Sequence, residues 1–284
     1  MVLNEKKITR IAVLDLNAGF PNQGMRCINE IVHRWAGEKK YDIVYDVFDV
    51  RVKNELPDLS YDIYISSGGP GDPLSTRFDD WDINWNRWFS DVIRWNENPD
   101  NPFKKFVFLI CHSFQLASRH FNAGLICKRK STSFGVFPMH VMPEAIGDPV
   151  FNNLKYPFYG VDSRDFQLIQ PNLDLLDSMG AYVTCLEKDR PHVPYERAVM
   201  GIRFSEYIFG TQFHPEADAV GMHQHFQDEE KQKVVIKNHG ESKLNSMLEH
   251  LEDPDKIHWT NTQLIPNFLN EAYSHLMVEE LAEV

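Results

Sequence analysis

The first 110 residues alternate short apolar runs with segments whose apolar residues recur at helical spacing. Runs rich in Val, Ile, Phe and Tyr predict strands at 8–16, 41–50, 61–67 and 105–110. Helical spacing predicts helices at 25–37 and 79–95. Strands that alternate with helices are typical of βαβ units. We therefore expect a mostly parallel sheet with helices on both faces.

The pattern changes twice in the second half of the chain. Short β-rich segments continue as FGVFPMHVM, PFYGVDSRDFQLI, AYVTCLEK, RAVMGIRF and YIFGTQF. After the His-Pro-Glu stretch at 214–216 the spacing becomes helical, and residues 217–284 carry 5 basic and 13 acidic residues. We therefore expect an α/β domain at 1–217 and an acidic helical extension at 218–284. This extension is either a solvated surface or a contact between two copies of the chain.

Composition excludes several classes of protein. With 43% hydrophobic residues, the 284-residue chain can fill a large core, and no apolar run approaches the roughly 20 residues of a membrane span. A net charge of −12 disfavours nucleic acid as a partner, because phosphate contacts need clustered Lys and Arg. The four cysteines show no CxxC spacing, so we expect neither a metal site nor disulfides. We expect a cytoplasmic protein.

Cys111 stands where the apolar run KFVFLI passes directly into a helical pattern. A nucleophile at a sharp strand-to-helix turn needs this position, because the turn exposes its side chain and aims the following N–H at a reacting carbonyl. The alternative is a small buried residue with no chemical role. The sequence around Cys111 does not by itself decide between the two.

Two other stretches bear on that choice. SSGGPGDP at 66–73 follows a predicted strand, and its glycines allow the backbone to present an N–H to a developing negative charge; an ordinary βα turn is the alternative. In GTQFHPE, His214 and Glu216 are two residues apart at a strand end and share a face. A carboxylate can then orient the imidazole that takes a proton from a thiol.

SSGGPGDP, ICHSFQ and GTQFHPE, in this order, resemble the three signatures of class I glutamine amidotransferases, over residues 8–217. The chain is similar to the amidotransferase domain of GMP synthetase. The resemblance implies a flavodoxin-like three-layer α/β sandwich with a mostly parallel central sheet, here followed by the helical extension. It also implies glutamine or a γ-glutamyl molecule as substrate and no cofactor. Because the sequence contains no SGGVDS-type loop, the ammonia-accepting synthetase is either a separate protein or absent.

By the same resemblance, Cys111 is the nucleophile, His214 the base and Glu216 its orienting partner. The other roles are an oxyanion hole formed by Gly69 and the N–H of His112, and substrate contacts by Gln115, Ser163 and Asp165. The family usually has glycine where this chain has Leu109 and Ser113. Small residues let a helix start pack closely against its strand, so Leu109 in particular is unexpected there.

Three functions remain open. The first is a glutaminase-type reaction, in which Cys111 attacks the glutamine side-chain amide, ammonia leaves, and water hydrolyses a γ-glutamyl thioester. The second is hydrolysis of a γ-glutamyl peptide or amide by the same triad. The third is a binding protein that keeps the fold without catalysis.

Overall fold

The computed structural model describes residues 8–20, 22–189, 196–222, 232–233, 236–237, 240–253 and 256–282. Its strands are β1 (Thr9–Asp15), β2 (Ile43–Asp49), β3 (Ile63–Ser66), β4 (Phe106–Ile110), β5 (Leu125–Val141), β6 (Phe158–Ile169), β7 (Tyr182–Leu186), β8 (Val199–Ser205) and β9 (Ile208–Thr211). Its α-helices are α1 (Gln23–Lys39), α2 (Asp80–Glu97), α3 (His112–His120), α4 (Leu173–Ser178), α7 (Glu241–Glu252) and α8 (Ile257–Ala282). Short 3₁₀ helices are η1 (Thr76–Phe78), η2 (Pro143–Ala145) and η3 (Pro149–Phe151).

The nine described strands form one sheet in the order β2-β1-β3-β4-β9-β8-β6-β5-β7. The first five strands in this order, from β2 to β9, pair parallel with one another, as the alternation of strands and helices predicts. Their carboxyl ends therefore lie along one edge of the sheet, which is where ligands bind in sheets of this kind.

The second half of the sheet is antiparallel, so the expectation of a mostly parallel sheet is wrong there. Strands β8, β6, β5 and β7 pair antiparallel with their neighbours, and β7 also pairs with β8. These four strands thus close on themselves, and we call them the antiparallel ring. Parallel pairing needs a crossover of a dozen or more residues, whereas β8 and β9 are separated by two residues, which permits only a hairpin. The fold is a mixed α/β fold.

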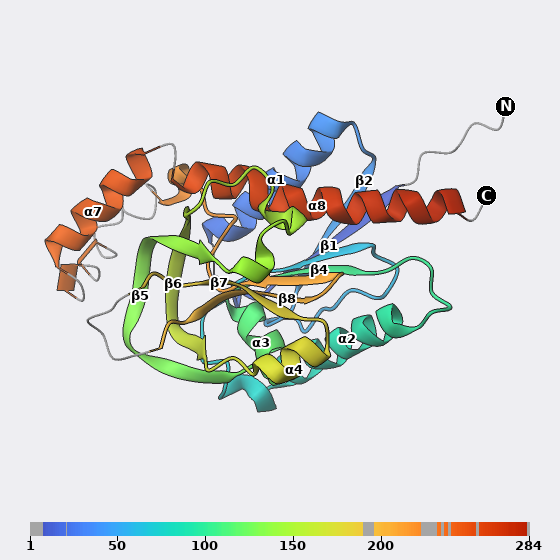
Figure 1. The fold of residues 1–284 in the computed structure, drawn as a ribbon, viewed down its shortest axis with the longest axis horizontal. Coiled ribbons are helices and arrows are strands. Elements are labelled where there is room, and N and C mark those ends of the chain that lie inside the picture. The colour runs from blue at the N-terminus through green and yellow to red at the C-terminus, as the bar shows by residue number, and fades with distance from the viewer. Residues whose placement is uncertain are drawn as a thin grey trace.

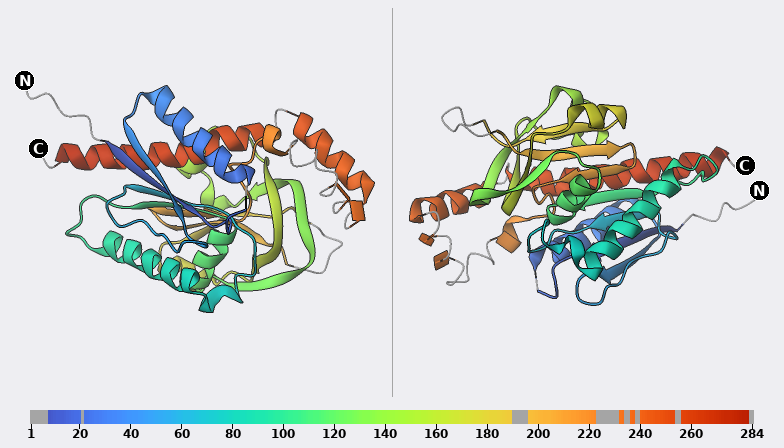
Figure 2. Two further views of the ribbon diagram at one scale, coloured as in Figure 1. Left: turned by 180° about the vertical axis from the view of Figure 1, so that it is seen from behind. Right: turned by 90° about the horizontal axis from the view of Figure 1, so that it is seen from below.

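Alternate residues of the buried strands point to opposite faces of the sheet. In β4, Phe106, Phe108 and Ile110 pack with α1 and α8, while Val107 and Leu109 pack with α2 and α3. Figures 1 and 2 show the resulting layers, with α1 and α8 on one side of the sheet and α2, α3 and α4 on the other. The uninterrupted apolar run in the sequence reflects burial on both faces.

The helical extension contributes to the main core. In α8, Leu264, Ile265, Phe268, Leu269 and Ala272 are fully buried in the same hydrophobic cluster as strands β1, β3 and β4. Helix α7 lies at the end of the molecule, beside β5 (Figure 1), where Leu244 packs with Val136. Within the segment of helical spacing, most of residues 225–240 lie outside the described residues, and the division at residue 217 stays a prediction.

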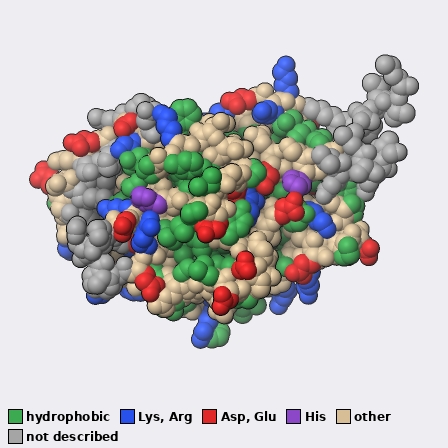
Figure 3. Space-filling view, in the orientation of Figure 1, with side chains coloured by type: hydrophobic (Ala, Val, Ile, Leu, Met, Phe, Trp, Pro, Cys, Tyr) green, Lys and Arg blue, Asp and Glu red, His purple; other side chains and the backbone are tan. Residues whose placement is uncertain are grey.

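Charged side chains of both signs are mixed on the face of the molecule drawn in Figure 3. On the face drawn in Figure 3, among the residues shown in colour, Lys and Arg side chains are scattered between Asp and Glu and do not gather into one basic patch. Within the described part of the chain, no helix combines the length and the hydropathy needed to cross a bilayer.

Candidate functional site

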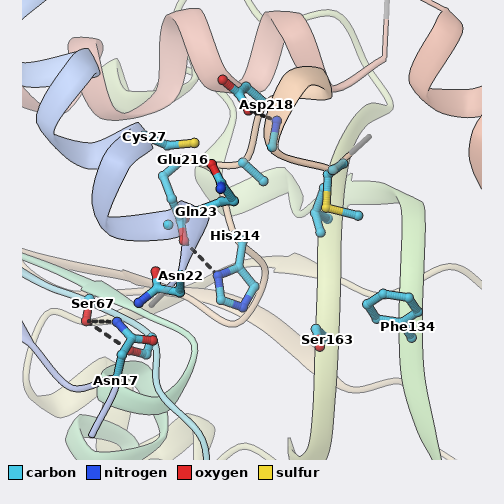
Figure 4. Close-up of a pocket in the computed structure, with 16 residues that line it drawn as sticks. Asn17, Asn22, Gln23, Cys27, Ser67, Phe134, Ser163, His214, Glu216 and Asp218 are labelled. Atoms are coloured by element: carbon cyan, nitrogen blue, oxygen red, sulfur yellow. Dashed lines mark hydrogen bonds and ion pairs between the residues drawn. The ribbon is translucent and has the colours of Figure 1, made fainter. Parts of the chain in front are cut away.

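A cavity of about 470 Å³ opens at the carboxyl ends of the parallel strands. One wall comes from the residues that follow β1, β3 and β9, and the opposite wall from the antiparallel ring. Figure 4 shows Ser163 of β6 and Phe134 of β5 facing His214 and Asn22 across the open space. The lining residues are Asn17, Asn22, Gln23, Gly24, Cys27, Ser67, Gly68, Phe134, Val161, Ser163, His214, Glu216, Ala217, Asp218, Gly221 and Met222.

Cys111 occupies the sharp turn that the sequence predicts. It lies between the last residue of β4 and the first of α3, and its φ of 50° is in the left-handed region that residues with a Cβ rarely adopt. Its backbone N–H donates to the carbonyl of Thr211 at 2.7 Å, which fixes the turn against the end of β9. The side chain is only 6% exposed. The backbone geometry is that of a nucleophile elbow.

Leu109 and Ser113 fit this turn for identifiable reasons. Leu109 pairs with Gly210 across β4 and β9, and a Cβ on Gly210 would lie 3.3 Å from that of Leu109. Because Gly210 on β9 has no side chain, there is room for the side chain of Leu109 on β4. The Ser113 hydroxyl hydrogen-bonds to the carbonyl of Ser66 at 2.8 Å and also contacts the Ser67 carbonyl. It joins the start of α3 to the glycine-rich turn.

His214 and Glu216 form a tight pair at the end of β9. Nδ1 of His214 lies 2.7 Å from Oε1 of Glu216, and Glu216 is 3% exposed. The backbone N–H of His214 donates to the Val161 carbonyl at 2.8 Å, which attaches this segment to β6. Glu216 also lies against the start of α1, where a Cβ on Gly24 would come within 3.2 Å of Oε1. The positive end of the α1 dipole favours the ionised carboxylate.

The structure brings the His214 ring beside Cys111. A Cβ on Gly68 would lie 2.8 Å from His214 Cε1 and 3.4 Å from Cys111 Cβ, so both side chains meet at this glycine. Burial would lower the pKa of His214, but the negative charges of Glu216 and Cys111, with the hydrogen bond to Glu216, hold it well above its usual range. The arrangement favours an imidazolium beside the elbow cysteine.

Gly68 and Gly69 are both needed for close packing, each against a different neighbour. Gly68 leaves space for the His214 ring, whereas a Cβ on Gly69 would lie 2.1 Å from the carbonyl oxygen of Leu16. Any side chain at residue 69 would therefore push the turn away from the end of β1. The oxyanion-hole role of Gly69 and the His112 N–H stays a prediction.

The His112 side chain does not compete with His214 as a base. The ring is buried beside Trp81, with 6.0 Å between the ring centroids. Burial, and then the positive charges of Arg51 and Arg119, lower the pKa of His112 to about 3, so the ring is neutral at physiological pH.

The three residues expected to contact substrate differ in position. Ser163 lines the cavity, and its carbonyl oxygen lies 3.9 Å from Cys111 Sγ. Asp165 accepts a hydrogen bond from Thr132 at 2.5 Å on an exposed part of the hairpin. Gln115 is buried and donates to Gln212 at 3.0 Å instead of pointing into the cavity. Their contacts with substrate remain predictions.

Sequence reasoning missed the wall formed by the end of β1 and the start of α1. Asn17, Asn22 and Gln23 line this side, and the Asn22 side chain caps α1 by accepting from the Met25 N–H. The signal was present, since polar residues that follow the carboxyl end of a parallel strand are placed at the binding edge.

Cys27 also lines the cavity, but it is not a second nucleophile. Burial and the nearby Asp218 carboxylate raise the pKa of Cys27 to about 12, so it stays a thiol at neutral pH. Asp218 itself pairs with Arg26 at 2.7 Å. Within the described ranges, no three His, Cys, Asp or Glu side chains are grouped so as to hold a metal ion.

Comparison with known proteins shows resemblance in structure only. No family model and no curated protein sequence matches the chain. A glutamine amidotransferase from Thermotoga maritima superposes with a TM-score of 0.63 at 14% identity, covering 94% of this chain and 98% of the other. A candidate GMP synthase subunit from Thermoplasma acidophilum gives 0.56 at 16% identity, with coverages of 96% and 98%. The glutaminase domain of Trypanosoma brucei CTPS gives 0.55 at 11% identity, with coverages of 95% and 94%. The chain is therefore similar in fold to the class I glutamine amidotransferases, and its likeness extends to proteins of the GMP synthase type.

Proposed function

We propose that the protein is a glutaminase-type amidohydrolase in which Cys111 attacks the side-chain amide carbon of glutamine. The observation that carries the proposal is the position of the His214 ring, which lies with the elbow cysteine around Gly68 and is hydrogen-bonded to the buried Glu216 carboxylate. The imidazolium donates a proton to the departing amine, and ammonia leaves. The neutral ring then takes a proton from water as it attacks the γ-glutamyl thioester, which releases glutamate and the thiolate.

The remaining predicted residues have roles consistent with their positions. The N–H groups of Gly69 and His112 would stabilise the oxyanion, an interaction typically worth about 3 to 4 kcal/mol per donor. Ser163, on the cavity wall, would contact the amino-acid end of the substrate. One neighbour is named as a GMP synthase subunit, which supports a separate synthetase as the acceptor of ammonia. We also propose that the protein is cytoplasmic.

Cavity volume supports a second candidate, hydrolysis of a γ-glutamyl peptide or amide. About 470 Å³ lies within the range of cavities that hold drug-sized ligands, so there is room for a substrate larger than free glutamine. The chemistry at Cys111 would be the same, with an amine other than ammonia as leaving group.

Ammonia release from glutamine, measured beside cleavage of γ-glutamyl peptides, tests both candidates. We expect turnover in the wild type and none in Cys111→Ala. Cleavage of peptides without any turnover of glutamine would replace the first candidate by the second. A chloroketone analogue of glutamine, with the modified residue mapped by mass spectrometry, should label Cys111. Equal labelling of wild type and Cys111→Ala, with no turnover of either substrate, would indicate a binding protein.

A further inference from the structure

We propose that Gln212 is a further catalytic residue of this site, donating a hydrogen bond from its side-chain amide to the Cys111 sulfur, and that Gln115 is a positioning residue that fixes the direction of this amide. The inference rests on the proposed role of Cys111 as nucleophile. It gives Gln115 a function that requires no contact with substrate.

Gln212 is held directly behind the sulfur. Its Nε2 lies 3.6 Å from Cys111 Sγ, a normal distance for a hydrogen bond to sulfur. The backbone fixes this placement, because Cys111 N–H donates to Thr211 O at 2.7 Å and Gln212 N–H donates to Met200 O at 2.9 Å. Gln212 is fully buried and is not among the described residues that line the cavity. It therefore contacts the sulfur from within the protein.

The hydrogen-bond pattern allows one orientation of the two amides. Gln115 Nε2 lies 3.4 Å from the Phe166 carbonyl oxygen, which can only accept. The same Nε2 lies 3.0 Å from Gln212 Oε1, so the nitrogen of Gln212 is left to face the sulfur. Turning Gln212 alone would bring two donors together, and turning both would place Gln115 Oε1 against a carbonyl oxygen. Phe166 thus sets the direction of both side chains through Gln115.

A donor at this position stabilises the sulfur when it carries negative charge. Cys111 is almost fully buried, so few waters can solvate an ionised sulfur, and hydrogen bonds to a charged group are about twice as strong as neutral ones. His214 approaches the sulfur at the cavity side and Gln212 from within the protein. Together they would stabilise the thiolate before attack and again when it leaves the thioester.

The chain contains a matched control. Gln167 Nε2 lies 3.7 Å from Cys127 Sγ, so it makes the same kind of contact with a cysteine outside the cavity. Gln167→Met removes an amide-to-sulfur hydrogen bond without touching Cys111.

The test is the rate of alkylation of Cys111 by iodoacetamide over a range of pH, with each modified cysteine quantified by peptide mapping. In Gln212→Met the rate near neutral pH should fall about tenfold, which corresponds to a displacement of the profile by about one pH unit to higher pH. The alkaline plateau should equal that of the wild type. Gln115→Met should move the profile in the same direction by less, and Gln167→Met should match the wild type. A merely structural role for Gln212 would not displace the profile.

A profile of folded Gln212→Met that overlays the wild type would overturn the proposal. If either single variant fails to fold, the double variant Gln115→Met/Gln212→Met decides, since replacing both partners leaves neither amide unpaired with the other. Ammonia release and Cys111 labelling in the wild type test the proposed function separately from the role of Gln212. If both are present and only the displacement is missing, the role of Gln212 fails while the proposed function stands.

Discussion

Replacing Glu216 by glutamine removes the negative charge of the side chain and keeps its size and shape. In the wild type, His214 Nδ1 lies 2.7 Å from Glu216 Oε1. The side-chain oxygen of glutamine can accept the same hydrogen bond, so the ring keeps its orientation. The lost quantity is the difference between a charge-assisted and a neutral hydrogen bond, about 1 to 2 kcal/mol. At about 1.4 kcal/mol per unit, the pKa of His214 should fall by about one unit.

The sign of this effect fixes the expected pH profile. The carboxylate favours the protonated ring and helps to raise the pKa of His214 well above its usual range. In the wild type the ring therefore keeps its proton to higher pH than a free imidazole does. Without the charge, the proton is lost at lower pH. The alkaline limb of glutaminase activity should therefore move down by about one pH unit, with an approximately tenfold loss of rate on that limb. The assay is ammonia release from glutamine as a function of pH.

An exposed His–Glu pair on the same protein supplies the control. Glu206 Oε1 lies 3.6 Å from His275 Nε2, and the Glu206 side chain is 58% exposed. Glu206→Gln should leave the activity profile unchanged. If folded Glu216→Gln keeps the wild-type alkaline limb, the carboxylate does not tune His214 and the reasoning is refuted.

Three further substitutions test the packing around the site through thermal or denaturant unfolding. Phe268→Ala in α8 should lower the free energy of unfolding by about 3 to 5 kcal/mol, because its ring is fully buried against the sheet; a change below 1 kcal/mol would favour an extension that folds apart from the core. Arg203→Met should cost about 3 to 5 kcal/mol, because it leaves the buried Asp148 carboxylate without the guanidinium that lies 2.6 and 2.7 Å from its oxygens; an unchanged midpoint would contradict this. Gly210→Ala should cost about 1 to 3 kcal/mol and reduce alkylation of the elbow cysteine, since its Cβ would lie 2.9 Å from the Phe114 ring; wild-type stability would show that β4 and β9 can separate without penalty.

The sequence predicted the parallel half of the fold well because its signals are local. The apolar run at 105–110 became β4, and the helical spacing at 25–37 became α1. The closure of β8, β6, β5 and β7 was not predictable in this way. A short strand has the same alternation in either pairing direction, so partner and direction depend on contacts between distant parts of the chain. The packing of α8 into the core was hidden for a similar reason, because the negative charge of its segment suggested an exposed surface.

The candidate triad was predictable because each member lies in a short signature. Cys111 and His214 needed only to be placed at adjacent strand ends, which a parallel sheet provides. Gln212 was missed although it lies two residues before His214 in the same signature. Its contact with the sulfur depends on the turn after β9, and a sequence does not show in which direction a buried amide points.

The two walls of the cavity come from separate parts of the sheet. Ser67, Gly68 and His214 follow strands of the parallel half, whereas Ser163 and Phe134 belong to the antiparallel ring. Substitutions of side chains on this wall, such as that of Phe134, would therefore change the shape of the cavity, while the backbone of β6 would still hold His214 through the Val161 carbonyl. A protein built in this way can change which molecule it admits through side chains on one wall, while the backbone contacts that hold His214 stay in place.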